Sequence, residues 1–174
     1  MTPFCINRLI VSGHTEEVKQ WQTKAGKPFA LNNLLPIPQN FADRPNRRTW
    51  WCIKHWGTSC EIYDVITGYK CEHGNAWAQY DFNSTLTAPV AAIDHAAKEF
   101  PELTFKLLYE QHSIVSVGKY YAICGKGKEI CKPVLEEWCD DECKGTYPIR
   151  LFGTAQCNKC GQEYTTKYPE EEYF

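Results

Sequence analysis

Hydrophobic and polar residues recur with different periods along the chain, and the first part predicts a strand followed by a helix. Residues 4–13 are rich in β-branched and aromatic side chains and end in a glycine, which is typical of a strand. Between Thr15 and Gly26 the apolar side chains recur at helical spacing, at Val18, Trp21 and Ala25. We therefore expect a β-α beginning.

The next segment, residues 27–60, breaks this rhythm. Prolines prevent long regular elements here and indicate a long insertion; they are Pro28, Pro36, Pro38 and Pro45. Residues 60–66 and 76–83 then have the composition of strands and are separated by turn residues. This pattern predicts a β-hairpin after the insertion.

A second helix and two more strands are expected after this hairpin. Residues 87–100 carry an apolar stripe at helical spacing, with Pro89 in the first turn. Residues 103–109 and 114–123 have the pattern of strands. The order β-α-β-β-α-β with one extra strand predicts an α+β fold, the ferredoxin-like split β-α-β sandwich, in which two helices cover one face of an antiparallel sheet.

The last part of the chain predicts a small helix-hairpin lobe. Residues 133–143 have a proline in the first turn and a glycine just past the end, which predicts a short helix. Residues 146–153 and 163–168 have strand character and flank a Cys-x-x-Cys-Gly turn at 157–161. The expected domains are a ferredoxin-like domain over 1–130 with an insertion at about 27–60, the lobe over 131–168, and an acidic tail over 169–174.

Four cysteines in this lobe have the spacing of a metal site: Cys139, Cys143, Cys157 and Cys160. A tetrahedral zinc ion binds four thiolate or imidazole ligands, and two short-range pairs separated by a hairpin-length spacer supply them. Because four protein ligands leave no position for water, the spacing predicts structural zinc in a zinc-ribbon-like lobe. The alternatives are reduced, partly buried cysteines, an adventitious disulfide or an iron–sulfur cluster.

Composition indicates the class of protein and its compartment. The 174 residues, 43% of them hydrophobic, suffice for one substantial core and a small satellite. Without a recognisable signal peptide or bilayer-spanning run, we expect the protein in a reducing cytoplasm, where ten cysteines favour metal binding over disulfides. A net charge of -2 argues against a general nucleic-acid binder.

The segment from Arg44 to Trp56 is the strongest candidate for a binding surface outside the lobe. It interleaves basic and aromatic side chains, which include Arg44, Arg47, Arg48, Trp50, Trp51 and Trp56. The arginines could follow phosphates while the indoles stack on unpaired bases, or both could anchor a protein interface. The tryptophans could instead pack in the core and leave the arginines in solvent.

Other groupings of reactive residues have less informative spacing. A second metal site or a Cys-His nucleophilic pair is one interpretation, and ordinary structural residues the other, for Cys52, His55, Cys60, Cys71 and His73. The Gly-Lys-Gly-Lys run at 125–128 is too short for a phosphate-binding loop and predicts a β-turn or strand–helix connection. Because no Ser, Cys or Thr lies in a recognised catalytic signature, we expect a protein that is not an enzyme.

Five short motifs, taken in order, resemble a known family. They are Phe4-Cys-Ile-Asn-Arg-Leu9, Leu35-Pro-Ile-Pro38, Trp51-Cys-Ile-Lys-His-Trp-Gly-Thr58, Phe100-Pro-Glu-Leu-Thr-Phe105 and Gly118-Lys-Tyr-Tyr121. Over residues 3–125 the chain resembles the YubB-type, ferredoxin-like proteins of bacterial plasmids and phages. The resemblance implies a ferredoxin-like fold and a mobile-element origin, and it implies no reaction and no catalytic residues.

Together these features predict a non-enzymatic phage or plasmid accessory protein with structural zinc. We expect it to bind a host macromolecule, first of all a protein such as a defence or regulatory factor. The alternative is a single-stranded nucleic-acid-binding module that uses residues 44–56. A third hypothesis, a cryptic hydrolase or redox protein, would require one cysteine of low pKa.

Overall fold

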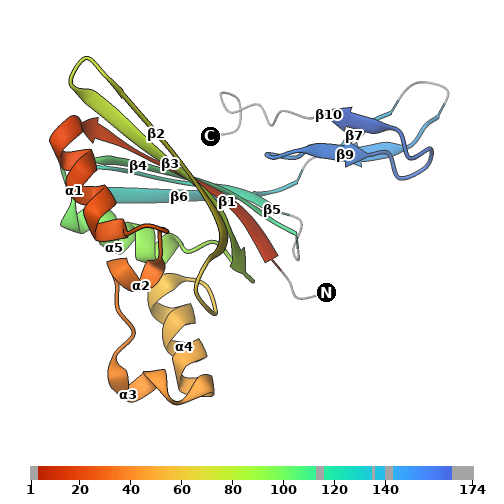
Figure 1. Cartoon of the computed structure of the whole chain (residues 1–174). Helices are drawn as coiled ribbons and strands as arrows, with labels where there is room; N and C mark the ends of the chain where they lie inside the picture. Colours follow the sequence, from red (N-terminus) through yellow and green to blue (C-terminus); the bar gives the residue numbers. More distant parts are fainter. Residues whose placement is uncertain (1–3, 113–115, 135, 140–142, 166–174) are drawn as a thin grey trace.

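The computed structural model describes residues 4–112, 116–134, 136–139 and 143–165, and its main body is one six-stranded antiparallel sheet (Figure 1). The strands lie side by side in the order β2-β3-β1-β4-β5-β6. Their bounds are β1 (Phe4–His14), β2 (Tyr63–Glu72), β3 (Asn75–Thr85), β4 (Thr104–Gln111), β5 (Ser116–Ile123) and β6 (Lys126–Pro133). The predicted α+β class is confirmed.

Two helices confirm the predictions made from apolar spacing. Helix α1 (Thr15–Ala25) begins directly after β1, and helix α5 (Val90–Glu99) lies between β3 and β4. The hairpin of β2 and β3 is longer than predicted because its turn consists of only two residues. His73 and Gly74 both have positive φ, 51° and 82°, as a tight two-residue hairpin turn requires.

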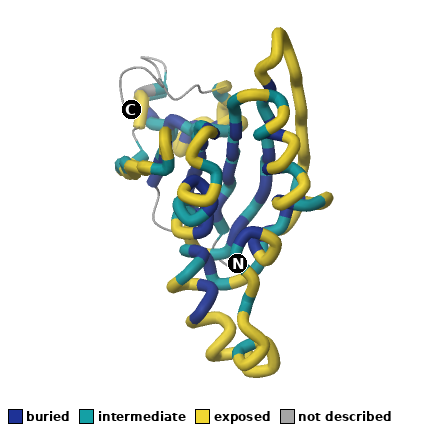
Figure 2. The backbone as a smooth tube through the Cα atoms, turned by 90° about the vertical axis from the view of Figure 1, so that its left-hand side faces the viewer, coloured by how far each residue is buried: buried dark blue, intermediate teal, exposed yellow. Residues whose placement is uncertain are grey.

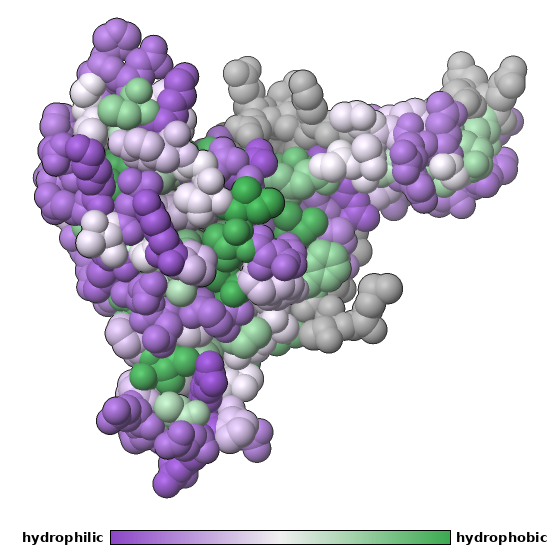
Figure 3. All heavy atoms as spheres, in the orientation of Figure 1, coloured by the Kyte–Doolittle hydropathy of each residue, from purple (hydrophilic) through white to green (hydrophobic). Residues whose placement is uncertain are grey.

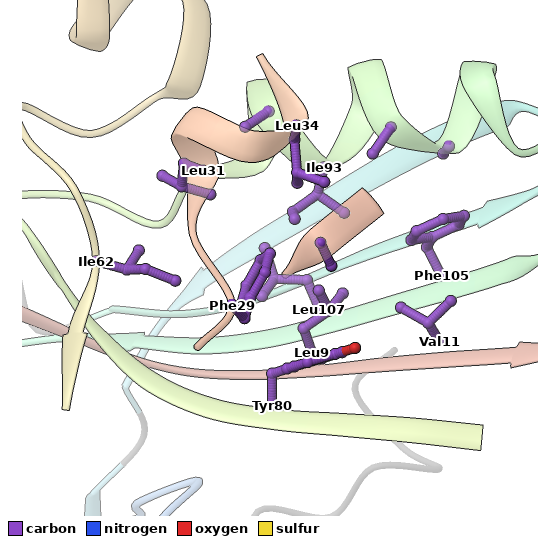
Figure 4. Close-up of a cluster of buried hydrophobic side chains, with 14 of the residues drawn as sticks. Leu9, Val11, Phe29, Leu31, Leu34, Ile62, Tyr80, Ile93, Phe105 and Leu107 are labelled. Carbon is purple, nitrogen blue, oxygen red and sulfur yellow. The ribbon is translucent and has the colours of Figure 1, made fainter. Parts of the chain in front are cut away.

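The hydrophobic core lies between the sheet and the helices that cover one of its faces. Trp21 of α1 is fully buried and donates its indole N–H to the Tyr80 hydroxyl at 3.1 Å. Strand side chains meet Ile93 of α5 in the same layer, among them Leu9, Val11, Tyr80, Phe105 and Leu107 (Figure 4). The sheet and its covering helices hold most of the buried residues, whereas the segment around α3 and α4 is largely exposed (Figure 2).

The insertion at residues 27–60 contains three helices, α2 (Leu31–Leu34), α3 (Gln39–Ala42) and α4 (Pro45–Trp56). The expectation that prolines prevent long elements here is wrong for α4. Pro45 occupies the first helical turn, where a missing N–H removes no intrahelical hydrogen bond. Gly57, with φ 88°, ends the helix in the left-handed conformation.

The C-terminal lobe consists of strands in its described part, so the predicted helix over residues 133–143 is wrong. Strand β6 extends to Pro133, because the edge of β5 offers backbone partners to residues 126–133. A proline is tolerated at the end of such an edge strand. The lobe then forms two hairpins, β7 (Glu136–Trp138) with β8 (Thr146–Pro148) and β9 (Thr154–Gln156) with β10 (Glu163–Thr165).

Two other predictions for this part of the chain have different outcomes. The turn predicted at 125–128 lies at Cys124 and Gly125, which have positive φ and connect β5 to β6, whereas residues 126–128 already belong to β6. The predicted pairing of 146–153 with 163–168 is wrong, because β8 pairs with β7 and a separate strand, β9, pairs with β10. The acidic tail at 169–174 lies outside the described residues.

Candidate metal centre

Each C-terminal hairpin carries two cysteines at its turn. Cys139 follows β7 and Cys143 precedes β8, while Cys157 follows β9 and Cys160 precedes β10. The two turns meet, and the four Sγ atoms all lie within 4.8 Å of one another. The structure thus brings together the four cysteines that the spacing selected, on two hairpin turns rather than on a helix and a hairpin.

The sulfur separations match those of a tetrahedral thiolate site. The Sγ atoms of Cys139 and Cys160 lie 3.7 Å apart, and those of Cys143 and Cys157 lie 3.6 Å apart. Zinc–sulfur bonds of about 2.3 Å in a tetrahedron give sulfur–sulfur edges of about 3.8 Å. A disulfide would need about 2.05 Å. The cluster could therefore bind a metal ion such as zinc.

Backbone and amide groups hold the two turns against each other. The backbone N–H of Thr146 donates to Asn158 Oδ1 at 3.0 Å, and the backbone N–H of Asn158 donates to the Thr146 carbonyl at 2.9 Å. Gly145 lies beside the ligands, where a Cβ would stand 2.5 Å from Cys157 Sγ. A side chain at position 145 would therefore occupy space that the sulfur needs.

Hydrogen bonds and burial act differently on the thiols. Backbone N–H groups of Cys160 and Lys159 lower the pKa of Cys157 to about 6. Partial burial, reinforced by the neighbouring Cys160 sulfur, raises the pKa of Cys143 to about 12. The Tyr164 hydroxyl lies 2.8 Å from Cys139 Sγ. A divalent cation bound here would displace the remaining protons and offset half of the negative charge of the four thiolates.

A buried ion pair attaches the lobe to the sheet. Glu110 of β4 is fully buried and accepts hydrogen bonds from the Arg150 guanidinium and from the backbone N–H of Leu151, the latter at 3.1 Å. His112 Nε2 lies 3.5 Å from the same carboxylate and has no hydrogen-bond partner among the described groups. Sequence reasoning missed this contact because Glu110 and Arg150 are 40 residues apart and neither stands in a motif.

The predicted basic-aromatic surface lies on α4, and the structure divides its tryptophans. Trp50 is 58% exposed, whereas Trp51 and Trp56 are only 6% and 0% exposed and are core residues. Trp56 donates its indole N–H to the Leu35 carbonyl at 2.9 Å. The basic residues of the segment stay exposed, namely Arg44, Arg47, Arg48 and Lys54. The surface keeps its cations, but two of its three indoles fill the interior.

The irregularly spaced cysteines and histidines do not come together. Within the described ranges, the lobe cysteines are the one group of three or more potential ligands whose donor atoms converge. Cys52 is buried, Cys60 Sγ lies 3.0 Å from Thr85 Oγ1, and Cys71 Sγ lies 3.3 Å from Thr15 Oγ1. These residues serve separate parts of the fold and share no site.

Comparison with known proteins identifies no relative: no protein family model, no curated protein and no solved structure matches this chain. In the part of the chain that the structure describes, none of the helices has the length and hydrophobicity needed to cross a membrane. Function must therefore be inferred from the residues themselves.

Proposed function

We propose that this chain is a non-enzymatic binding protein whose C-terminal lobe folds around one structural zinc ion. Zinc is supported by the distances between the cysteine sulfurs, which are close to the sulfur–sulfur distance of a zinc ion with four thiolate ligands. With four protein ligands the ion has no position left for water or substrate, so it would stabilise the lobe rather than take part in a reaction. An iron–sulfur cluster fits less well, because its cysteines bind separate iron atoms and need more space between the sulfurs.

We further assign the main body to the ferredoxin-like arrangement. The strand order β2-β3-β1-β4 supports this assignment, with α1 between β1 and β2 in the chain and α5 between β3 and β4. Strands β5 and β6 would then be additions at one edge. The resemblance to YubB-type proteins supports an origin in a phage or plasmid.

An exposed ridge on α4 is the observation that supports binding to a protein partner. Trp50 and Ile53 are 58% and 49% exposed and lie one helical turn apart. The Lys54 ammonium lies 5.1 Å from the centroid of the Trp50 ring, and Arg47 stands one turn before Trp50. We call Arg47, Trp50, Ile53 and Lys54 the α4 ridge. Exposed large apolar side chains flanked by arginine are typical of hot spots in protein interfaces.

The charge of the α4 ridge indicates the kind of partner. Its basic side chains would complement an acidic rim around an apolar pocket that receives Trp50. A host defence or regulatory protein with such a surface would suit a protein of a mobile element. Zinc then has the indirect role of keeping the C-terminal lobe folded while α4 makes the contact.

Capture of bacterial proteins on the immobilised, zinc-loaded chain tests this proposal. Ile66→Ala is the matched control, because Ile66 on β2 is 70% exposed and its replacement also removes an exposed apolar side chain. A partner that the wild type and Ile66→Ala retain and Trp50→Ala loses supports the α4 ridge as the interface. Equal retention by all three proteins, or loss with Ile66→Ala alone, would show that the ridge is not the interface.

The alternative function is binding of single-stranded nucleic acid by residues 44–56. The exposed arginines at 44, 47 and 48 favour it, but Trp50 is the one indole of this segment with an exposed face. Under this alternative, replacing Arg47 and Arg48 by glutamate should abolish oligonucleotide binding without affecting the fold. A protein interface anchored by Trp50 should respond more strongly to Trp50→Ala.

A further inference from the structure

The six-stranded sheet has a second face, opposite the helices. On β1, Leu9 and Val11 point into the core, so Ile10 between them points to the other side. In β-sheets, residues directly opposite each other on neighbouring strands share a face. The register of the strands therefore identifies the residues of this second face.

One row of side chains crosses this face from β1 to β6. Ile10 lies opposite Lys106 of β4, Lys106 opposite Tyr121 of β5, and Tyr121 opposite Lys128 of β6. Tyr121 is 39% exposed, and Lys128 is exposed. The row thus places an accessible aromatic ring between two lysines on neighbouring strands.

A second row lies beside the first. Ser12 of β1 is opposite Trp77 of β3, and Trp77 is opposite Lys70 of β2. At the other end of the sheet, Ile123 of β5 lies opposite Lys126 of β6, and Ile123 is 47% exposed. This row repeats the combination of an aromatic or apolar side chain with a lysine.

Lysine ammonium groups approach both aromatic rings. Lys70 Nζ lies 5.0 Å from the centroid of the Trp77 ring, and Lys119 Nζ lies 5.7 Å from that of Tyr121. Strands β3 and β5 are three steps apart in the sheet, which at about 4.8 Å a step separates the two strands by roughly 14 Å. We call the following set the open sheet face: Lys70, Trp77, Lys106, Lys119, Tyr121, Ile123, Lys126 and Lys128.

Five lysines lie on this face although the whole chain has a net charge of -2. Of the acidic residues beside it, Asp81 is bound to Arg8 at 2.7 Å, and Glu72 lies 3.5 Å from Lys70. The C-terminal lobe covers one end of the sheet, where the Phe152 ring lies 5.4 Å from the Arg8 guanidinium carbon. In Figure 3 the lobe projects from the body beside a surface that mixes hydrophobic and hydrophilic residues.

We propose that the open sheet face binds single-stranded nucleic acid, with the lysines along the phosphates and Tyr121 and Trp77 stacked on bases. The exposed Tyr121 and the half-buried Trp77 on an antiparallel sheet suit this ligand, because each unpaired base offers a flat face and a positive surface attracts the backbone. A duplex hides its base faces and should bind less tightly. This inference goes beyond the proposed protein partner and uses a surface other than the α4 ridge.

Fluorescence anisotropy of the full-length, zinc-loaded protein with a labelled oligothymidylate, and with a duplex of the same length, tests the proposal. We expect salt-sensitive binding that is tighter for the single strand. The double variant Lys126→Glu/Lys128→Glu should bind more weakly, and its salt slope should fall by about 1.4 if each lysine contacts one phosphate. The variant Arg47→Glu/Arg48→Glu makes the same change of charge on α4 and should bind like the wild type.

Stacking is tested separately at Tyr121. Replacing it with alanine should weaken binding roughly five- to 150-fold, whereas phenylalanine should preserve binding. Circular dichroism checks that each variant is folded. Absence of binding by the wild type at low salt, tighter binding of the duplex, or equal loss in both charge variants would overturn the proposal. Loss confined to Arg47→Glu/Arg48→Glu would assign the nucleic acid to α4 instead.

Discussion

Replacing Gly145 with alanine should weaken zinc binding, because the added methyl group would collide with a ligand sulfur. The new Cβ would lie 2.5 Å from Cys157 Sγ and 2.9 Å from Lys159 Cβ. Ordinary contact begins at 3.4 Å, so the sulfur or the turn must move by about 0.9 Å, several times the roughly 0.2 Å that metal–ligand distances tolerate. The substitution therefore acts on the site without removing a ligand.

The expected loss is about 10- to 100-fold in zinc affinity, the range seen when groups that position metal ligands are changed. This corresponds to about 1.4–2.7 kcal/mol. Because the lobe would fold together with its metal, the same free energy should be lost from the stability of the zinc-loaded lobe. The main body has its own core and should keep its stability.

Competition with a chromophoric chelator measures the zinc affinity, and circular dichroism reports the fold. Gly68→Ala is the control, because its Cβ would meet the nearest atom, Gln79 Cβ, at an ordinary 3.9 Å. We expect this variant to bind zinc as the wild type does. If Gly145→Ala also binds zinc with unchanged affinity, Cys157 is not held beside Gly145 as a ligand, and the four-sulfur site is refuted.

Three other substitutions test the site and its attachment to the sheet. Cys157→Ser should remove bound zinc and lower the melting temperature; unchanged zinc content by metal analysis together with unchanged melting would contradict structural zinc. Arg150→Met leaves the charge of the buried Glu110 less compensated and should lower the free energy of unfolding, measured with denaturant, by roughly 3 kcal/mol. Adding Glu110→Gln should restore most of this free energy in the double variant. An unchanged free energy of unfolding in Arg150→Met would mean that the pair does not hold the lobe. Burial lowers the pKa of His112, beside Glu110 and Arg150, below its ordinary value of 6.5. As the pH falls, the His112 imidazole is therefore protonated in the unfolded chain before it is protonated in the folded chain. Stability that is present above pH 6.5 is lost as the pH falls through that value. His112→Phe should flatten the loss in unfolding curves between pH 7 and 5, and parallel curves for the two proteins would show that another group is responsible.

Local signals in the sequence were sufficient for the elements that depend on neighbours along the chain. The spacing of Val18, Trp21 and Ala25 predicted α1, because a helix brings residues three and four apart onto one face. The cysteine spacing predicted which four sulfurs meet, because short turns keep each pair together whatever the surrounding structure is. The prediction of the four cysteines therefore survived an incorrect assignment of the elements around them.

Tertiary structure decided the features that depend on distant partners. Residues 133–143 begin with a proline and are followed by a glycine, as a helix often is, yet β6 ends and β7 forms there. The edges of β5 and β8 supply backbone partners that no local pattern reveals. Trp50 and Trp51 are adjacent in sequence and equally apolar. Packing alone determines that Trp51 is buried and Trp50 exposed.

The two surfaces with proposed partners show the same division. From the sequence, the basic and aromatic residues of α4 stood out because they are contiguous. The residues of the open sheet face come from five strands, and strand pairing unites them, for example the pairing of Lys106 with Tyr121 and of Trp77 with Lys70. Composition along the chain determined which side chains were present, and strand register determined which of them share a face, because register joins residues far apart in sequence.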